Sequence, residues 1–170
     1  MDDSDAEAID LGVVNPLLVD GFSVLRRAKT QRDREDQPGF VPPVVERFGL
    51  LLAEVRMIPV SSTATLWITP GSKGAALSMQ RTPANGRASW FAQAEAICSR
   101  GLWGVLESPD GRRALCGLVP DGSSSVRLQL HAGGTRWLPT VDGAVVVDEI
   151  EPIRAIGFVD ALGYQQQLPC

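Results

Sequence analysis

The chain has 170 residues and, with 16 basic and 20 acidic side chains, a net charge of −4. This length is enough for one ordinary domain with its own core, and the acidic balance gives no reason to expect nucleic acid as a partner. No apolar run reaches 18 residues, so the sequence predicts no membrane span. It also lacks the pattern of a secretory signal, although a signal or anchor upstream of Met1 stays open.

Residues 1–40 are predicted to form an N-terminal arm with a charged linker. Acidic residues come first, apolar ones follow as far as Val19, and a short helix is expected within 21–30. Arg26, Arg27 and Lys29 could bind phosphate or anionic lipid, but the acidic residues that follow favour an ordinary solvated face. The proline-rich segment 38–43 ends the arm, and a β-rich domain is expected at 41–170.

A helix at about 43–55 is expected to cover one side of the β core. Its apolar residues fall on one helical stripe: Val44, Val45, Phe48, Leu51, Leu52 and Val55. Pro43 suits a first helical turn, and Gly49 is the weak point.

From residue 56 onward the apolar residues alternate with polar ones, and turn residues recur every 8–12 positions. Strands are expected at 56–60, 64–69, 75–80, 101–107, 112–119, 126–130, 135–140, 144–148, 153–159 and 164–168, with a second short helix at 89–98. Pro59 predicts an edge position for the first strand, because proline cannot donate a hydrogen bond to a neighbouring strand.

Two Pro-Asp-Gly turns, at 109–111 and 120–122, bracket one strand and favour a meander. The predicted fold is therefore mainly β. We expect an antiparallel meander that forms a sandwich or a partly open barrel, with one or two packing helices and an N-terminal helical arm.

Two segments stand out, of which the first is Phe22-x-Val24-Leu25-Arg26-Arg27 with Thr30 and Asp33. The second is Gly117-Leu118-Val119-Pro120-Asp121-Gly122 before an alternating strand. Together they resemble a set of uncharacterised proteins of high-GC Gram-positive bacteria, many of them exported or membrane-anchored. The resemblance covers about residues 22–165. It implies a β domain outside the cytoplasm and supplies no catalytic residues; a cytoplasmic location is the alternative.

Cys98 and Cys116 could form a disulfide or remain two free buried thiols. The oxidising compartment implied by the resemblance favours the bridge, which would stabilise the fold by about 3 kcal/mol. Neither a metal site nor a cofactor is expected, because the sequence has no Cys-x-x-Cys motif and no histidine cluster.

The only histidine, His131, lies in a predicted turn. A hydrolase would need it as a base beside Ser123, Ser124 or Ser125, yet no Gly-x-Ser-x-Gly motif is present. An exposed turn histidine is the simpler interpretation.

The four tryptophans could fill the core or, if exposed, form a platform for a ligand or partner. Candidate partner-surface residues are Phe22, Leu25, Arg26, Arg27, Trp67 and Trp137. The sequence thus predicts a non-enzymatic binding or structural module of an exported or surface-associated protein, which meets a protein or cell-surface component. An intracellular assembly or regulatory protein that docks through its N-terminal arm is the alternative, and an oligomer is possible in either case.

Overall fold

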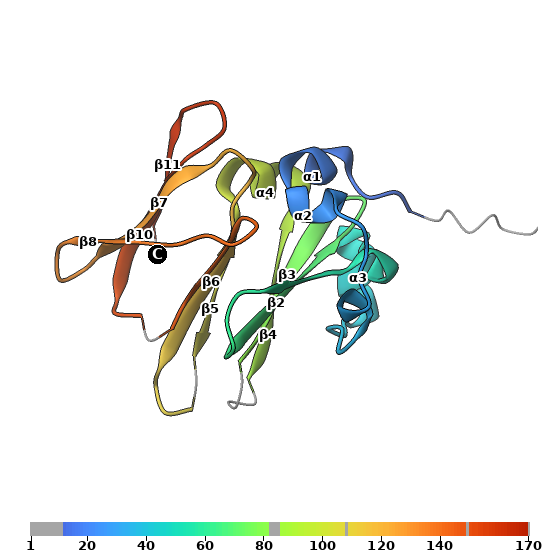
Figure 1. Cartoon of the computed structure of the whole chain (residues 1–170), viewed down its shortest axis with the longest axis horizontal. Helices are drawn as coiled ribbons and strands as arrows, with labels where there is room; N and C mark the ends of the chain where they lie inside the picture. The colour runs from blue at the N-terminus through green and yellow to red at the C-terminus, as the bar shows by residue number, and fades with distance from the viewer. Residues whose placement is uncertain (1–11, 82–85, 108, 149, 170) are drawn as a thin grey trace, which may run out of the picture.

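The computed structural model describes residues 12–81, 86–107, 109–148 and 150–169. Its described strands form three antiparallel sheets, as predicted for a mainly β chain (Figure 1). The first sheet runs in the order β1 (Arg56–Pro59), β2 (Ala64–Pro70), β3 (Gly74–Arg81) and β4 (Arg87–Gln93). The middle sheet is β5 (Leu102–Glu107), β6 (Arg113–Leu118) and β9 (Ala144–Val147). The outer sheet is β11 (Gln165–Pro169), β10 (Ile153–Val159), β7 (Ser124–Leu130) and β8 (Thr135–Trp137).

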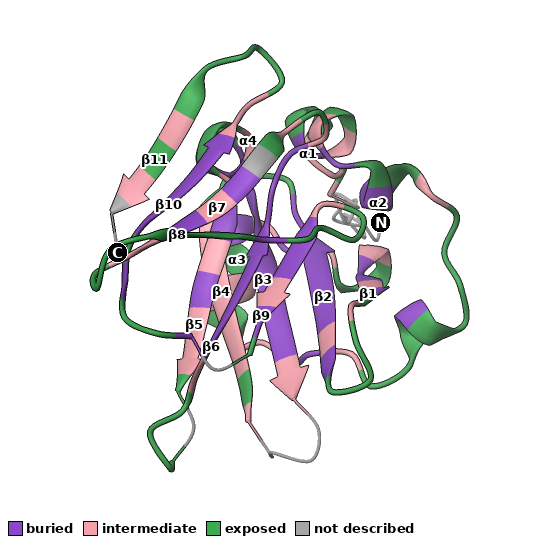
Figure 2. Ribbon diagram, turned by 60° about the vertical axis from the view of Figure 1, so that its left-hand side comes forward, coloured by how far each residue is buried: buried purple, intermediate pink, exposed green. Residues whose placement is uncertain are grey.

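The middle sheet lies between the other two, and its strands β6 and β9 are packed on both faces. Along β6, Ala114, Cys116 and Leu118 join a core shared with the first sheet, whereas Leu115 joins a core shared with the outer sheet. The same alternation holds along β9, which explains its unbroken Ala-Val-Val-Val sequence. Figure 2 shows how burial is concentrated in the inner strands and falls off toward β11. The result is a layered sandwich, not a closed barrel.

The first sheet is a meander, and β5–β6, β7–β8 and β10–β11 also pair as consecutive strands, but the strand that follows Pro120-Asp121-Gly122 does not pair with the strand before it. Pro120-Asp121-Gly122 reverses the chain, yet β6 pairs with β5 and β9, while β7 pairs with β10 and β8. The turn therefore carries the chain from the middle sheet to the outer one. Pro59 does lie on an edge strand, because β1 pairs only with β2 among the described strands.

The covering helix is shorter than predicted. Helix α3 (Pro42–Phe48) ends at Gly49, whose φ of +60° places it in the left-handed region that glycine tolerates best. A 3₁₀ turn, η2 (Leu52–Glu54), follows. Phe48 stacks on Phe91 of β4, with ring centroids 5.5 Å apart, so α3 covers the outer face of the first sheet as expected.

The second helix begins later than predicted, because residues 89–93 belong to the strand β4. Helix α4 covers Ala94–Arg100, and Trp90 belongs to β4. No helix in the described part of the chain is long and apolar enough to cross a membrane.

The predicted N-terminal arm is built into the body of the protein from about residue 14 onward. It contains α1 (Pro16–Gly21), α2 (Ser23–Arg26) and the 3₁₀ turn η1 (Arg32–Arg34). Leu18, Phe22 and Val24 are at most 3% exposed and share one core with strands of the first and middle sheets. The predicted helical arm therefore forms, and this stretch packs against the sheets because burial of these apolar side chains outweighs the solvation of their charged neighbours. The prediction for residues 1–11 lies outside the described residues.

Candidate binding cleft

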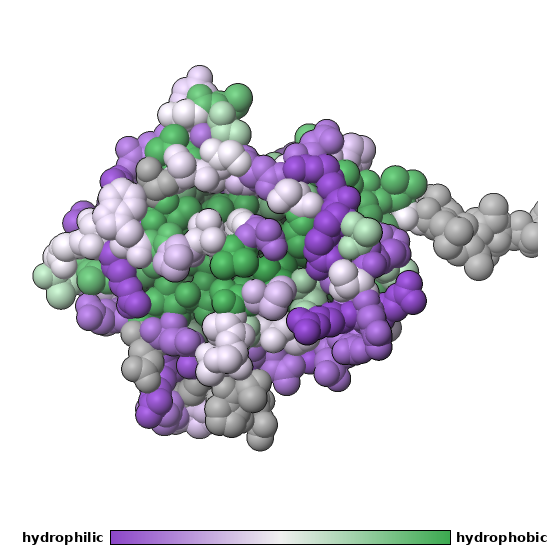
Figure 3. Space-filling model, in the orientation of Figure 1, coloured by the Kyte–Doolittle hydropathy of each residue, from purple (hydrophilic) through white to green (hydrophobic). Residues whose placement is uncertain are grey.

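A cleft of about 460 Å³ lies where the middle sheet faces the outer sheet. The middle sheet contributes Trp103, Val105 and Leu115, and the outer sheet contributes Ile153 and Ile156. Figure 3 shows apolar side chains gathered at the centre of one face of the molecule, with hydrophilic ones around them. The strand β5, which contributes Trp103, Gly104 and Val105 to the cleft, is an edge strand of the middle sheet.

Two tryptophans line the cleft, and each lies on a glycine of a neighbouring strand. The Trp90 indole of β4 lies against Gly104 of β5, where a Cβ atom would fall inside the ring. Trp103 lies in the same way on Gly117, its partner in the β5–β6 register. Its indole nitrogen donates to the Arg100 carbonyl at 3.0 Å, so hydrogen bonding and close packing both fix the ring.

The polar lining of the cleft is gathered at one end. Arg113 is the first residue of β6, and its carbonyl accepts a hydrogen bond from the Ile150 amide at 2.9 Å. His131 follows β7, and its amide donates to the Pro152 carbonyl at 3.1 Å. The short connection from β9 to β10 thus holds both Arg113 and His131 at the same end, and the rest of the lining is mostly apolar.

Sequence reasoning singled out the tryptophans and His131 but missed Arg113. The one available signal was a pair of arginines, at 112 and 113, directly before an apolar strand. That signal does not say that the second arginine turns toward the neighbouring sheet.

The residues predicted to form a partner surface do not lie together on one surface of the protein. Phe22 is 1% exposed, Leu25 8% and Trp67 3%, so these three belong to the interior and not to a surface. Trp137 is 60% exposed on β8, and it remains available to a partner.

The basic residues of the N-terminal segment are occupied by internal contacts. Arg26 pairs with Asp121 at 2.6 Å, and Lys29 pairs with Glu54 at 2.8 Å. The turn at residue 121 also donates its amide to the Gly21 carbonyl at 2.7 Å. These side chains therefore fasten the segment to the sheets and do not form an open phosphate-binding patch.

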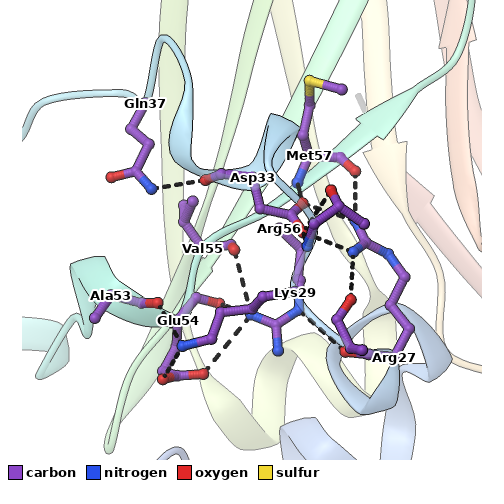
Figure 4. Close-up of polar contacts among 11 residues, drawn as sticks. Arg27, Lys29, Asp33, Gln37, Ala53, Glu54, Val55, Arg56 and Met57 are labelled. Atoms are coloured by element: carbon purple, nitrogen blue, oxygen red, sulfur yellow. Dashed lines mark hydrogen bonds and ion pairs between the residues drawn. The ribbon is translucent and has the colours of Figure 1, made fainter.

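Asp33 is the centre of the most buried polar network in this region (Figure 4). Its carboxylate is 1% exposed and accepts hydrogen bonds from both terminal nitrogens of Arg27, at 2.7 and 2.8 Å, and from the amides of Thr30 and Met57. Burial alone would raise the pKa of Asp33, but these donors outweigh it and hold the pKa far below its ordinary value. The network joins the N-terminal segment to β1, a structural role.

The predicted disulfide is not formed. Cys98 and Cys116 are both free thiols, in α4 and in β6 respectively. The Cys98 thiol donates to the Leu17 carbonyl at 3.3 Å, whereas Cys116 is fully buried in the core between the first and middle sheets. Burial raises the pKa of both thiols. The resemblance implied an oxidising compartment and therefore a disulfide, and the structure does not contain that disulfide.

The hydrolase candidate is not assembled. Ser124 begins β7 and His131 directly follows it, so the two residues are about 23 Å apart at the usual rise of about 3.3 Å per residue. A serine and its histidine base must be within hydrogen-bond reach. In the described ranges, no three His, Cys, Asp or Glu side chains come together as ligands for a metal ion.

A second hollow of about 390 Å³ lies beside β1 and β2, with Trp67, Thr65 and Gln80 in its lining. Trp67 packs beneath the Arg87 guanidinium, which lies 5.1 Å from the ring centroid. Arg32, Glu35 and Asp36 also line this hollow, so it mixes both signs of charge and has no single electrostatic preference.

Comparison with known proteins returned no match among family models, curated proteins or solved structures.

Proposed function

We propose that the protein is a non-enzymatic binding module that holds a small apolar molecule in the cleft between its middle and outer sheets. The observation that carries this proposal is the cleft itself, with two fixed indoles and aliphatic walls. Its volume of about 460 Å³ falls in the range of small-molecule sites, which are mostly apolar and contain few polar groups.

The interior of the protein supports this choice of site. The core on the other side of the middle sheet contains many fully buried side chains, including Leu66, Ile68 and Leu77. Between the middle and outer sheets Leu128 and Phe158 are buried as fully, but Trp103 and Val105, which line the cleft, are only partly buried. An apolar ligand would cover the side chains that the two sheets leave accessible, and it would gain about 25 cal/mol for each Å² of apolar surface removed from water.

We place the module in an exported or surface-associated protein of a bacterium, on the resemblance alone. The alternative, an intracellular protein that docks through its N-terminal arm, has less support because Leu18, Phe22 and Val24 are already buried against the sheets.

The experiment is a titration of the protein with N-phenyl-1-naphthylamine, a neutral apolar probe whose emission rises in an apolar site. Val105→Trp would place an indole in the cleft from the edge strand β5, at a position that is only partly buried. The matched control is Val41→Trp, which adds the same side chain at a residue that is 62% exposed before α3.

We expect saturable binding of one probe per chain to the wild type and to the control. Val105→Trp should weaken this binding by about tenfold or more, because one methylene-sized overlap already costs about 1–3 kcal/mol in a packed site. Equal binding by both tryptophan variants would show that the probe lies elsewhere, and the absence of binding by the wild type would refute the proposal.

A further inference from the structure

Arg113 is the polar residue of the cleft whose contacts the fold does not explain. Its Nε atom is buried and has no hydrogen-bond partner among the described residues. Leaving a buried donor unpaired costs about 1–3 kcal/mol, and more when the group is charged. The Nε–H group of Arg113 is therefore a hydrogen-bond donor that an acceptor entering the cleft would satisfy.

Other arginines of this protein show the contrast. Arg27 is held by Asp33, Arg81 by Asp148 at 2.9 Å, and Arg56 by backbone carbonyls as well as Glu54. Arg113 has carboxylates nearby, because Glu107 is its register partner on β5 and Glu151 lines the shallow hollow on its other side. Neither of these two carboxylates forms an ion pair with it.

The cleft has one polar end, at Arg113, and an apolar remainder. The guanidinium and His131 lie at the end held by the β9–β10 connection, while Trp103, Leu115 and Ile156 line the remainder. A ligand that satisfies both parts must have an apolar body and one terminal acceptor. A planar guanidinium binds a carboxylate through two parallel hydrogen bonds, which makes an anion the best match for that acceptor.

We propose that the cleft binds an apolar monocarboxylate, with its carboxylate on the Arg113 guanidinium and its hydrocarbon part between the middle and outer sheets. His131, an exposed residue that also lines the cleft, offers a second hydrogen-bonding side chain at this end. This inference rests on the proposed function and adds the chemical class of the ligand to it.

The test compares two ligands of equal chain length, octanoate and 1-octanol, as competitors of N-phenyl-1-naphthylamine. The wild type should bind octanoate about tenfold or more tightly than 1-octanol, because only the carboxylate satisfies the arginine. Arg113→Gln should abolish this preference and leave 1-octanol binding within about twofold. Arg113→Lys should keep part of it, since a lysine supplies the charge without the paired geometry.

Arg136→Gln is the matched control, because it removes the same charge from an exposed position on β8. It should keep the wild-type preference. Circular dichroism of each variant shows whether it is folded. The comparison of octanoate with 1-octanol on the wild type tests the proposal even if a variant does not fold.

The outcomes separate the two proposals. If 1-octanol binds the wild type as tightly as octanoate, or if Arg113→Gln keeps the preference, the carboxylate assignment is refuted while the apolar cleft stands. If neither ligand displaces the probe and the probe itself binds equally to Val105→Trp, the proposed function fails as well.

Discussion

Replacement of Asp33 by alanine should loosen the N-terminal segment from the sheets. The change removes an acceptor that is 1% exposed and leaves Arg27, Thr30 and Met57 with donors directed at an empty space. Breaking a buried pair in this way costs about 3–5 kcal/mol. For a chain of this size, each kcal/mol lowers the Tm by about 2–4 °C, so the expected loss is about 6–20 °C.

The same carboxylate gives the stability a defined dependence on pH. The pKa of Asp33 is lower in the folded protein than its ordinary value of 3.8, because Arg27 and the amides stabilise the ionised form. The unfolded chain therefore binds a proton first as the pH falls. The contribution of Asp33 is fully present above about pH 5 and is lost progressively below about pH 4. Asp33→Asn has no such titration, so its free energy of unfolding should fall less between pH 6 and pH 3 than that of the wild type.

Urea denaturation at pH 7, followed by circular dichroism, measures the effect. Glu35→Gln is the control, because it removes one charge from an exposed residue of the same segment whose carboxylate bonds only Gln31 among the described contacts. That variant should stay within about 0.5 kcal/mol of the wild type. A free energy of unfolding for Asp33→Ala within about 1 kcal/mol of the wild type would refute the view that this network holds the segment.

Three further changes test the packing described above. Gly117→Ala would drive a methyl group into the Trp103 ring; it should destabilise the protein by about 1–3 kcal/mol in urea denaturation, and an unchanged midpoint would mean that the ring is not held there. Cys98 and Cys116 should both be alkylated when the protein is unfolded without reductant, as mass spectrometry would show, and a pair protected from alkylation would restore the disulfide. Trp137→Ala removes a side chain that is 60% exposed, and its free energy of unfolding should change by less than about 1 kcal/mol; a larger loss would place that indole in a contact.

The strands could be predicted from sequence because their signals are local. Alternating apolar residues bounded by Gly, Pro and Asp placed β1, β2 and β3 within a residue or two of their ends. The sequence marks Gly49 as the weak point of the covering helix, and the helix ends there instead of continuing to about residue 55, because glycine tolerates the left-handed conformation. Such features depend on neighbours along the chain.

Sheet membership could not be predicted, because it depends on pairs that are distant in sequence. β6 pairs with β9 across an interval that contains β7 and β8. A Pro-Asp-Gly turn fixes a reversal of direction, but the packing of Leu115 and Val145 between two sheets decides which strand comes next to which. The N-terminal segment was misjudged for a related reason: its charged residues suggested solvent, although they bond to distant groups such as Asp121.

The sequence did not predict the cleft. Sequence reasoning weighed the tryptophans as either core or platform, and the structure places Trp67 in the interior, Trp137 on the surface and Trp103 at the margin of a cleft. No local sequence pattern marks Arg113, because the cleft that it lines forms only when the outer sheet packs opposite the middle sheet.

The most direct test of the binding cleft is a two-dimensional NMR titration of ¹⁵N-labelled protein with octanoate. We predict saturable shifts at the amides of Leu115, Ile153 and Ile156, which face one another across the two sheets. Shifts centred instead on Thr65 and Trp67, or no saturable shifts in the described strands, would contradict the assignment of this cleft as the binding site.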